Sequence, residues 1–431
     1  MRPFLMEDVL ERERFTARHN AGESGGPALR LKELLELIAR SKLASAQVLH
    51  PNQLQFAKEE VEQISAELVH ELLALSLRDS PNYGITELRK HIARLHPQAS
   101  VENVLVTTGT SEALYLAFQV LQPKKVALIV PGFQLLTELV ESAQPLQQSN
   151  SFASPLLALT LRWNEQLRPE AQEEEWLAQI DREKPDTILI NHPHNPSGWL
   201  PSLGFLARIQ DLARGVGARI LGDEHYRFLC MPESVKQPDR ISDNFPLGPT
   251  LFENDGSTLV TGSFIKCLGT PGLRIGWCVG PKELIDKMQS LKNYTTHTVN
   301  PVSEWLSEHV LRDASLPCFV SAHELWSKNR ALVQDWAAMQ PEKGWRCHAP
   351  QGGWVTALSH QSFPQKKQKL AARLKERGCF LLDLELMELN RFGHSSCALK
   401  QRGGFRLGLG MAHQELQQLL DILDFESKQL A

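Results

Sequence analysis

The stretch Thr261-Gly-Ser-Phe-Ile-Lys266-Cys-Leu-Gly-Thr-Pro-Gly-Leu-Arg274-Ile-Gly-Trp277 decides how the rest of the chain is interpreted. The run before it, Thr258–Val260, predicts a buried strand that delivers Lys266 into small residues and glycines, where backbone can approach a ligand closely. Burial or a nearby positive charge lowers the pKa of an amine, and a neutral amine can add to a carbonyl group. Ser263 and Arg274 place a hydroxyl and a guanidinium on either side, which suits a phosphate. An ordinary strand–loop lysine with a surface arginine is the alternative.

A glycine turn between a short strand and a helix forms a second candidate anion site. In Val104-Leu-Val-Thr-Thr108-Gly109-Thr110-Ser111-Glu112-Ala-Leu, a β-rich run turns through a glycine into an amphipathic helical pattern that continues to Leu121. Backbone amides and two hydroxyls would converge at this helix N-terminus, which attracts anions through its free N–H groups and its dipole. A threonine or serine N-cap without a ligand is the alternative.

Two polar side chains follow predicted buried strands elsewhere in the chain. Asn195 lies in Asn191-His-Pro-His-Asn195-Pro196-Ser-Gly198, where a proline stiffens the turn after a strand. Asp223 ends the strand pattern that begins at Arg219, and a buried carboxylate is costly unless it has a partner. Open α/β sheets bind ligands at the carboxyl ends of their strands, so both residues are candidates for ligand contacts.

In this order the motifs resemble those of a known family. The pattern N-P-x-G, then Asp223 and Tyr226, then S-x-x-K with G-L-R-I-G-W, is similar to fold-type I enzymes that use pyridoxal 5′-phosphate (PLP), the class I/II aminotransferase family of the aspartate aminotransferase superfamily. The resemblance extends from about Asn82 to Asn300 and resumes at Gly352 and Arg406.

The resemblance implies an α/β fold. A large domain would contain a mostly parallel seven-stranded sheet flanked by helices, and a smaller α+β domain would combine the N-terminal arm with the C-terminal part. On this basis residues 1–75 form the arm and part of the small domain, residues 76–320 the large PLP-binding domain, and residues 321–431 the C-terminal small domain.

The resemblance also implies a set of cofactor-binding residues. Lys266 would bind PLP covalently and move the α-proton of the substrate, while Asp223 would keep the pyridine nitrogen protonated. Tyr226 and Asn195 would contact the phenolic oxygen, and Phe133 would stack on the ring, with a simple core phenylalanine as the alternative. Lys266, Asp223 and Tyr226 are the expected catalytic residues. The full expected cofactor-binding set is Gly109, Thr110, Ser111, Phe133, Asn195, Asp223, Tyr226, Ser263, Lys266 and Arg274.

Arg406 is the expected anchor for the substrate. It stands alone in a small apolar strand pattern, and because arginine is always charged, burial there calls for an anion that its fork can bind in two hydrogen bonds. The resemblance assigns it to the α-carboxylate of an amino acid. Ser24 in the glycine-rich arm, Tyr83 and Trp354 complete the expected substrate-binding set, with a docking arm and a half-buried tyrosine as the alternatives. In the family such a tyrosine often reaches a neighbouring subunit's cofactor, so a homodimer is implied.

Composition narrows the class of protein. The 431 residues suffice for two domains, and 46 Lys+Arg against 50 Asp+Glu, a net charge of −4 without a long basic run, argue against a nucleic-acid partner. Seven scattered cysteines favour free thiols in a reducing cytoplasm. Without an apolar signal-peptide core or a run of ~20 apolar residues, a cytoplasmic protein that does not enter membranes is expected. His192 and His194 lack a carboxylate at ligand spacing, so no metal site is predicted.

Neither the sequence nor the resemblance indicates a functional role for two segments. Residues 31–77 show a helical pattern, interrupted by Pro51, that is longer than in most members of the family. Residues 232–257 are rich in Pro, Asp and Asn and are expected to form a surface excursion.

The function expected from the motifs is that of an amino-acid aminotransferase. The stretches around Ser111, His192 and Pro271 also resemble capreomycidine synthase-like members of the family, which cyclise a hydroxylated arginine. The same early chemistry would then lead to elimination and ring closure, so a cyclase or eliminase is the first alternative. A sensor that binds PLP without turnover is the second, although the first 80 residues show no basic DNA-binding pattern.

Overall fold

The structure is a computed structural model that describes residues 3–47, 56–142, 155–161, 169–231, 245–313, 315–338, 344–347, 349–387 and 403–429. The chain divides into two compact units. Unit 1 comprises Met1–Pro27, Leu121–Leu221 and Leu325–Ala431, and unit 2 comprises Ala28–Val120 and Gly222–Glu324. These boundaries differ from the three parts 1–75, 76–320 and 321–431, a division that stays a prediction.

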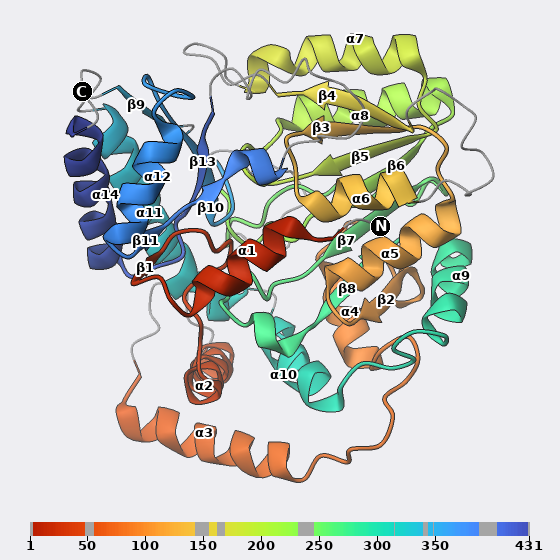
Figure 1. Ribbon diagram of the computed structural model, residues 1–431. Helices are drawn as coiled ribbons and strands as arrows, with labels where there is room; N and C mark the ends of the chain where they lie inside the picture. The colour runs from red at the N-terminus through yellow and green to blue at the C-terminus, as the bar shows by residue number, and fades with distance from the viewer. Residues whose placement is uncertain are drawn as a thin grey trace. The chain divides into compact units, whose positions relative to one another are not determined.

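A mixed, mostly parallel sheet of seven strands confirms the expected α/β fold class. The strand order is β2-β8-β7-β6-β5-β3-β4 (Figure 1). β3 pairs in parallel with β4 and β5, whereas β8 is antiparallel to β2 and β7. β3, β5 and β7 are buried at every position, as their continuous apolar runs predict. The strands are β2 Val104–Thr107, β3 Val126–Val130, β4 Leu156–Thr160, β5 Thr187–Asn191, β6 Arg219–Asp223, β7 Thr258–Gly262 and β8 Gly276–Val279.

Unit 1 also contains two smaller sheets. Four antiparallel strands have the order β12-β13-β10-β9, and β1 pairs in parallel with β11. These strands are β1 His19–Asn20, β9 Trp345–Cys347, β10 Val355–His360, β11 Cys379–Phe380, β12 Leu382–Asp383 and β13 Phe405–Gly408. Apolar residues of the N-terminal helix α1, Met6 and Leu10, form a buried cluster with Ala357, Leu382 and Met387, so this helix is packed against the small sheet.

Ion pairs join two helices of unit 1. α12 and α14 lie side by side (Figure 1), and Arg373 and Arg377 of the first region both bind the buried Glu426 of the second. The helices are α1 Leu5–Arg14, α6 Gln134–Ser142, α7 Glu173–Glu183, α8 Leu203–Val216, α12 Lys367–Glu376 and α14 His413–Lys428, with 3-10 turns η4 Pro169–Gln172 and η9 Leu384–Met387. α11, Val320–Ala338, begins in unit 2 and continues into unit 1.

Unit 2 holds the helices of the long N-terminal segment. The pattern over residues 31–77 forms α2 and α3, which pack against each other, and Pro51 lies outside the described residues. The helices are α2 Leu31–Gln47, α3 Lys58–Leu73, α4 Thr86–Arg94, α5 Thr110–Leu121, α9 Lys282–Lys292 and α10 Pro301–Leu311, with 3-10 turns η2 Val101–Asn103, η6 Pro271–Leu273 and η7 Pro317–Phe319.

The prediction of a surface excursion over residues 232–257 is wrong for residues 245–252, whereas residues 253–257 are exposed or half-buried as predicted. Residues 232–244 lie outside the described part of the chain, but Phe245, Leu251 and Phe252 are buried. The Phe245 ring centroid lies 6.0 Å from that of Phe319, and Leu251 N–H donates to Glu224 at 2.7 Å. The segment is polar in overall composition, but it contains a few large apolar residues that pack against residues distant in the sequence.

The six described cysteines are free thiols, as expected. None of the helices in the described part of the chain has the length and apolar character needed to cross a membrane.

Candidate active site

In unit 2, Asp223 and Lys266 follow two neighbouring strands of the sheet. β6 ends at Asp223, and β7 ends four residues before the half-buried Lys266. Asp223 is only 1% exposed, and Thr261 Oγ1 donates to its Oδ1 at 3.4 Å. His225 Nδ1 lies 3.1 Å from the same oxygen, and Glu224 N–H donates to Thr261 carbonyl at 2.8 Å. Thr261, in the strand β7 that precedes Lys266, therefore also orients the Asp223 carboxylate.

Tyr226 is completely buried beside this carboxylate. Its ring centroid lies 4.0 Å from that of His225, the imidazole that contacts Asp223. The expected pair of catalytic residues on this strand end, Asp223 and Tyr226, is thus linked through the histidine between them.

The glycine turn before α5 is shaped by close backbone approach to the Arg274 segment. Gly109 has φ +81°, and a Cβ there would lie 2.7 Å from Arg274 Nη2. A Cβ on Gly276 would lie 2.5 Å from the carbonyl carbon of Gly109. Thr110 and Ser111 begin α5, where the first amides have no carbonyl one turn earlier. Free amides beside a guanidinium form a donor set that fits a phosphate group.

Ser263 is buried next to this turn and already has partners in the chain. Its hydroxyl donates to Ile275 carbonyl at 2.7 Å and accepts from Ile265 N–H at 3.2 Å. The hydroxyl thereby ties the lysine segment to the residue that follows Arg274, and a direct bond to a phosphate would require it to rotate.

In unit 1, Arg406 and Asn195 are brought together from distant parts of the sequence. Arg406 lies in β13, is 1% exposed, and donates from Nη1 to Asn195 Oδ1 at 3.2 Å. Its Nη2 donates to the carbonyl of Gly22 in the N-terminal arm. The arm is held by Gly408 N–H, which donates to Ala21 carbonyl at 2.7 Å. Ser24, two residues after Gly22, is partly buried in the same arm.

The aromatic residues predicted for the site have partners within their own units. Phe133 is half-buried, with its ring 5.7 Å from Phe4, and Trp354 is completely buried. Tyr83 donates its hydroxyl to Asp286 at 3.0 Å, and burial followed by this bond raises the pKa of the tyrosine. Contacts of Tyr83 with a neighbouring subunit, of Phe133 with the ring and of Trp354 with a substrate stay predictions.

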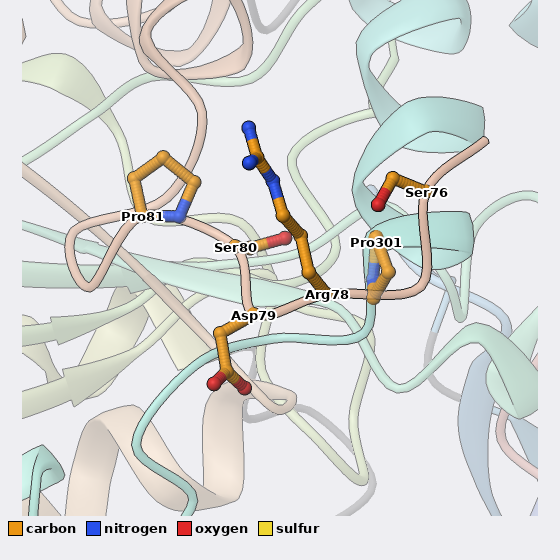
Figure 2. Close-up of a pocket in the computed structure, with 6 residues that line it drawn as sticks. All are labelled: Ser76, Arg78, Asp79, Ser80, Pro81 and Pro301. Atoms are coloured by element: carbon orange, nitrogen blue, oxygen red, sulfur yellow. The ribbon is translucent and has the colours of Figure 1, made fainter.

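A shallow pocket of about 540 Å³ lies just before Tyr83 in unit 2. Figure 2 shows that Arg78 and Asp79 project in opposite directions from the chain that lines it. The lining residues are Ser76, Arg78, Asp79, Ser80, Pro81 and Pro301. None of them belongs to the residues expected to bind the cofactor.

Sequence reasoning missed Glu112, which contacts the backbone of the turn that it follows. Its carboxylate accepts from Thr108 N–H at 2.7 Å. A glutamate placed in the first turn of a helix after a threonine-rich turn is the signal that could have indicated this contact.

A model of the family described as aminotransferase class I and II matches residues 42–423. The chain belongs to this family. Capreomycidine synthase from Streptomyces vinaceus is 30% identical over 318 residues, which cover 70% of this chain and 72% of that protein. The crystal structure of a PLP-dependent aminotransferase from Streptococcus suis 89-1591 has a TM-score of 0.77 at 18% identity, covering 100% of this chain and 98% of that one. A PLP-dependent cyclase in complex with Au has a TM-score of 0.74 at 21% identity and covers the same shares.

These likenesses define the class of enzyme and its cofactor. The two solved structures support the fold-type I architecture, and membership of the class I and II aminotransferases makes this chain a PLP-dependent enzyme. The amides and guanidinium around Gly109 fit the phosphate of PLP, and the buried Asp223 fits its pyridine nitrogen.

Proposed function

We propose that this enzyme is an amino-acid aminotransferase that converts an amino acid to a keto acid. The observation that supports removal of the α-proton, the step that this function shares with the alternative below, is the buried Asp223 carboxylate, which accepts a hydrogen bond from Thr261 of β7 ahead of the segment that carries Lys266. A ring acid and an amine on neighbouring strands are the two groups that proton transfer at the α-carbon of an amino acid requires.

PLP, when bound, draws electrons away from the α-carbon of an amino acid that is attached to it. The Asp223 carboxylate keeps a proton on the pyridine nitrogen, which maintains this electron withdrawal. Lys266 Nζ would hold the cofactor at its aldehyde carbon, and as a free amine it would take the proton from the substrate Cα. Tyr226 and Asn195 would hold the cofactor at its phenolic oxygen, and Phe133 would contact its ring.

The phosphate anchors the cofactor at the start of α5. Thr110 and Ser111 offer backbone amides, Gly109 lets the backbone approach, and Arg274 supplies a guanidinium. Ser263 fixes the segment between Lys266 and Arg274 through its bond to Ile275 carbonyl.

Arg406 binds the α-carboxylate of the substrate. Arg406 lies in β13 and is buried. Its guanidinium donates to Asn195 Oδ1 and Gly22 carbonyl, and these two bonds fix the orientation of the guanidinium before a substrate binds. Ser24 of the same arm, Tyr83 and Trp354 are the further residues proposed to contact the substrate.

A cyclase or eliminase that acts on a hydroxylated, arginine-like amino acid is the second candidate. Its specific support is the 30% identity with capreomycidine synthase, together with the likeness of fold to a PLP-dependent cyclase. Lys266, Asp223 and Arg406 would have the same tasks up to removal of the α-proton. A leaving group on the substrate side chain would then depart, and the cofactor would be recovered unchanged.

One experiment separates these functions. The PLP-loaded protein is mixed with a panel of amino acids that includes hydroxyarginines, the cofactor absorbance is followed, and products are identified by mass spectrometry. A keto acid with pyridoxamine phosphate supports the aminotransferase, whereas loss of water with PLP returned supports the cyclase. If no amino acid changes the cofactor absorbance, both proposals fail and a PLP-binding sensor remains.

We also propose that the enzyme acts as a homodimer in the cytoplasm. The homodimer is implied by the resemblance to the family, and Leu73, Leu77 and Tyr294 of unit 2, which are 81%, 80% and 90% exposed, would be available to a partner chain. Light scattering during size-exclusion chromatography tests the dimer, and a mass of one chain, 48.5 kDa, would contradict it.

A further inference from the structure

We propose that Glu112 is a positioning residue for the cofactor phosphate, an inference that rests on the proposed phosphate site at the start of α5. Its carboxylate joins the turn before α5 to a second turn formed by Thr295 and Thr296. This connection fixes the direction in which the backbone amides of Thr110 and Ser111 point.

Three donors from two distant segments meet on this one carboxylate. Thr108 N–H donates to Oε2 at 2.7 Å. Thr295 Oγ1 and Thr296 Oγ1 donate to Oε1 at 3.0 and 2.6 Å, although they lie 183 and 184 residues away in the sequence. An ionised carboxylate is an acceptor only and receives all three without rearrangement. Glu112 is therefore a cross-link and more than a local helix cap.

The second turn is itself a firm support. Lys292 at the end of α9 is 1% exposed and donates from Nζ to His297 carbonyl at 2.8 Å. The Lys292 carbonyl accepts from the backbone N–H groups of Thr295 and His297 at 3.0 and 2.9 Å. Burial lowers the pKa of Lys292, while the charges of Glu112 and Glu304 oppose this change. The bonds to Thr295 and Thr296 therefore oppose a shift of the Glu112 carboxylate away from this turn.

Because the Thr108 N–H is bound to Glu112, the positions of the backbone amides that follow Thr108 are restrained. Gly109 N–H donates to Thr107 carbonyl at 2.9 Å, so this amide and that of Thr108 both have partners within the chain. The amides of Thr110 and Ser111, next along the chain, are the ones that the helix start presents to an anion. A glycine at φ +81° lies between them and Thr108, and its carbonyl accepts from Thr107 Oγ1 at 3.0 Å, so Glu112 adds a second restraint to this turn.

The negative charge of Glu112 cannot be what favours phosphate binding. A carboxylate in the first turn of the helix that binds a phosphate repels that phosphate, so any benefit must come from position. Glutamine keeps the shape and removes the charge, because its oxygen can accept from Thr108 N–H and its NH₂ can donate to the hydroxyls of Thr295 and Thr296. Alanine removes both shape and charge. The two variants therefore separate positioning from electrostatics.

The test measures binding of PLP and of pyridoxal, which lacks the phosphate, to apoprotein by absorbance titration. We expect Glu112→Ala to weaken PLP at least tenfold and pyridoxal less than twofold, and Glu112→Gln to bind PLP within threefold of wild type. Thr295→Val with Thr296→Val, which leaves the contact to Thr108, should weaken PLP about threefold. Glu283→Ala, an exposed glutamate in the first turn of α9, is the matched control and should change neither ligand.

Several results would overturn the inference. Equal losses for PLP and pyridoxal in Glu112→Ala would mean a general structural role, and wild-type PLP affinity in that variant would mean no role. If Glu112→Ala does not fold, wild-type affinity of the double threonine variant refutes the cross-link. Failure of the proposed phosphate site is distinguishable, because wild-type protein would then bind PLP no more tightly than pyridoxal.

Discussion

Acidification is expected to destabilise unit 2 through His96, which lies just after α4. The side chain is 2% exposed, its Nδ1 is 3.0 Å from Thr250 Oγ1, and Arg227 Nη1 lies 3.3 Å from the same nitrogen. Burial, and then the charge of Arg227, lower the pKa of His96 from 6.5 to about 3, while Glu224 opposes the shift. The imidazole is therefore neutral in the folded protein at every pH at which the enzyme would work.

The direction of the effect follows from the two pKa values. Below pH 6.5 the unfolded chain binds a proton on His96 that the folded protein does not bind until about pH 3, so stability is lost as the pH falls through this window. Between pH 7 and pH 5 the loss is about 2 kcal/mol. This number depends little on the folded value, because at pH 5 the folded imidazole is still almost entirely neutral.

The assay is urea unfolding at pH 7, 6 and 5, followed by tryptophan fluorescence. His96→Asn keeps a polar side chain that can hydrogen-bond to Thr250 but cannot titrate, so we expect it to be less stable at pH 7 and to lose about 2 kcal/mol less than wild type on going to pH 5. His70→Asn, at an exposed position on α3, is the matched control and should keep the wild-type slope. Equal pH slopes for His96→Asn and wild type would refute the reasoning.

Three further predictions concern the proposed chemistry. Lys266→Ala should abolish the covalent attachment of PLP to the chain on borohydride reduction, as seen by mass spectrometry, whereas the exposed control Lys282→Ala should keep it. Attachment of PLP to the Lys266→Ala protein would exclude Lys266 as the residue that binds the cofactor. Asp223→Asn should lower kcat about 10²- to 10⁴-fold with bound PLP retained, and unchanged turnover would remove Asp223 from the mechanism. Arg406→Lys should raise KM for the amino acid about 10- to 100-fold because a bidentate bond to the carboxylate is lost, and an unaltered KM would contradict its role.

Local patterns were sufficient to predict most elements of the fold. The run Thr258–Val260 forms the first three residues of β7, and the pattern at Arg219–Asp223 is β6. Continuous apolar residues that end in a polar or glycine residue fix such strands without reference to the rest of the chain. The helical pattern over residues 31–77 likewise became α2 and α3 because its apolar residues recur at helical spacing.

Contacts between distant segments were beyond sequence reasoning. Asn195 and Arg406 had been given separate tasks, and a hydrogen bond across 211 residues leaves no trace in either local pattern. Phe245 and Leu251 occur among prolines and aspartates, so their composition indicated surface, whereas Phe319 and Glu224 provide a buried place for them. Burial depends on what lies opposite in space, and a local window does not contain that information.

The neighbouring carboxylates Asp223 and Glu224 illustrate this limit at the site itself. Asp223 is the last residue of β6, Glu224 follows it directly, and both are 1% exposed. Glu224 lies 3.3 Å from Arg227 Nη1, so its charge is compensated within unit 2, and removing either partner would leave the other buried and uncompensated. Asp223 is oriented instead by the Thr261 hydroxyl and the His225 imidazole, beside the strand that leads to the proposed catalytic lysine. Glu224 therefore stabilises the fold around the strand end, whereas Asp223 is the acid proposed to hold the pyridine nitrogen of the cofactor.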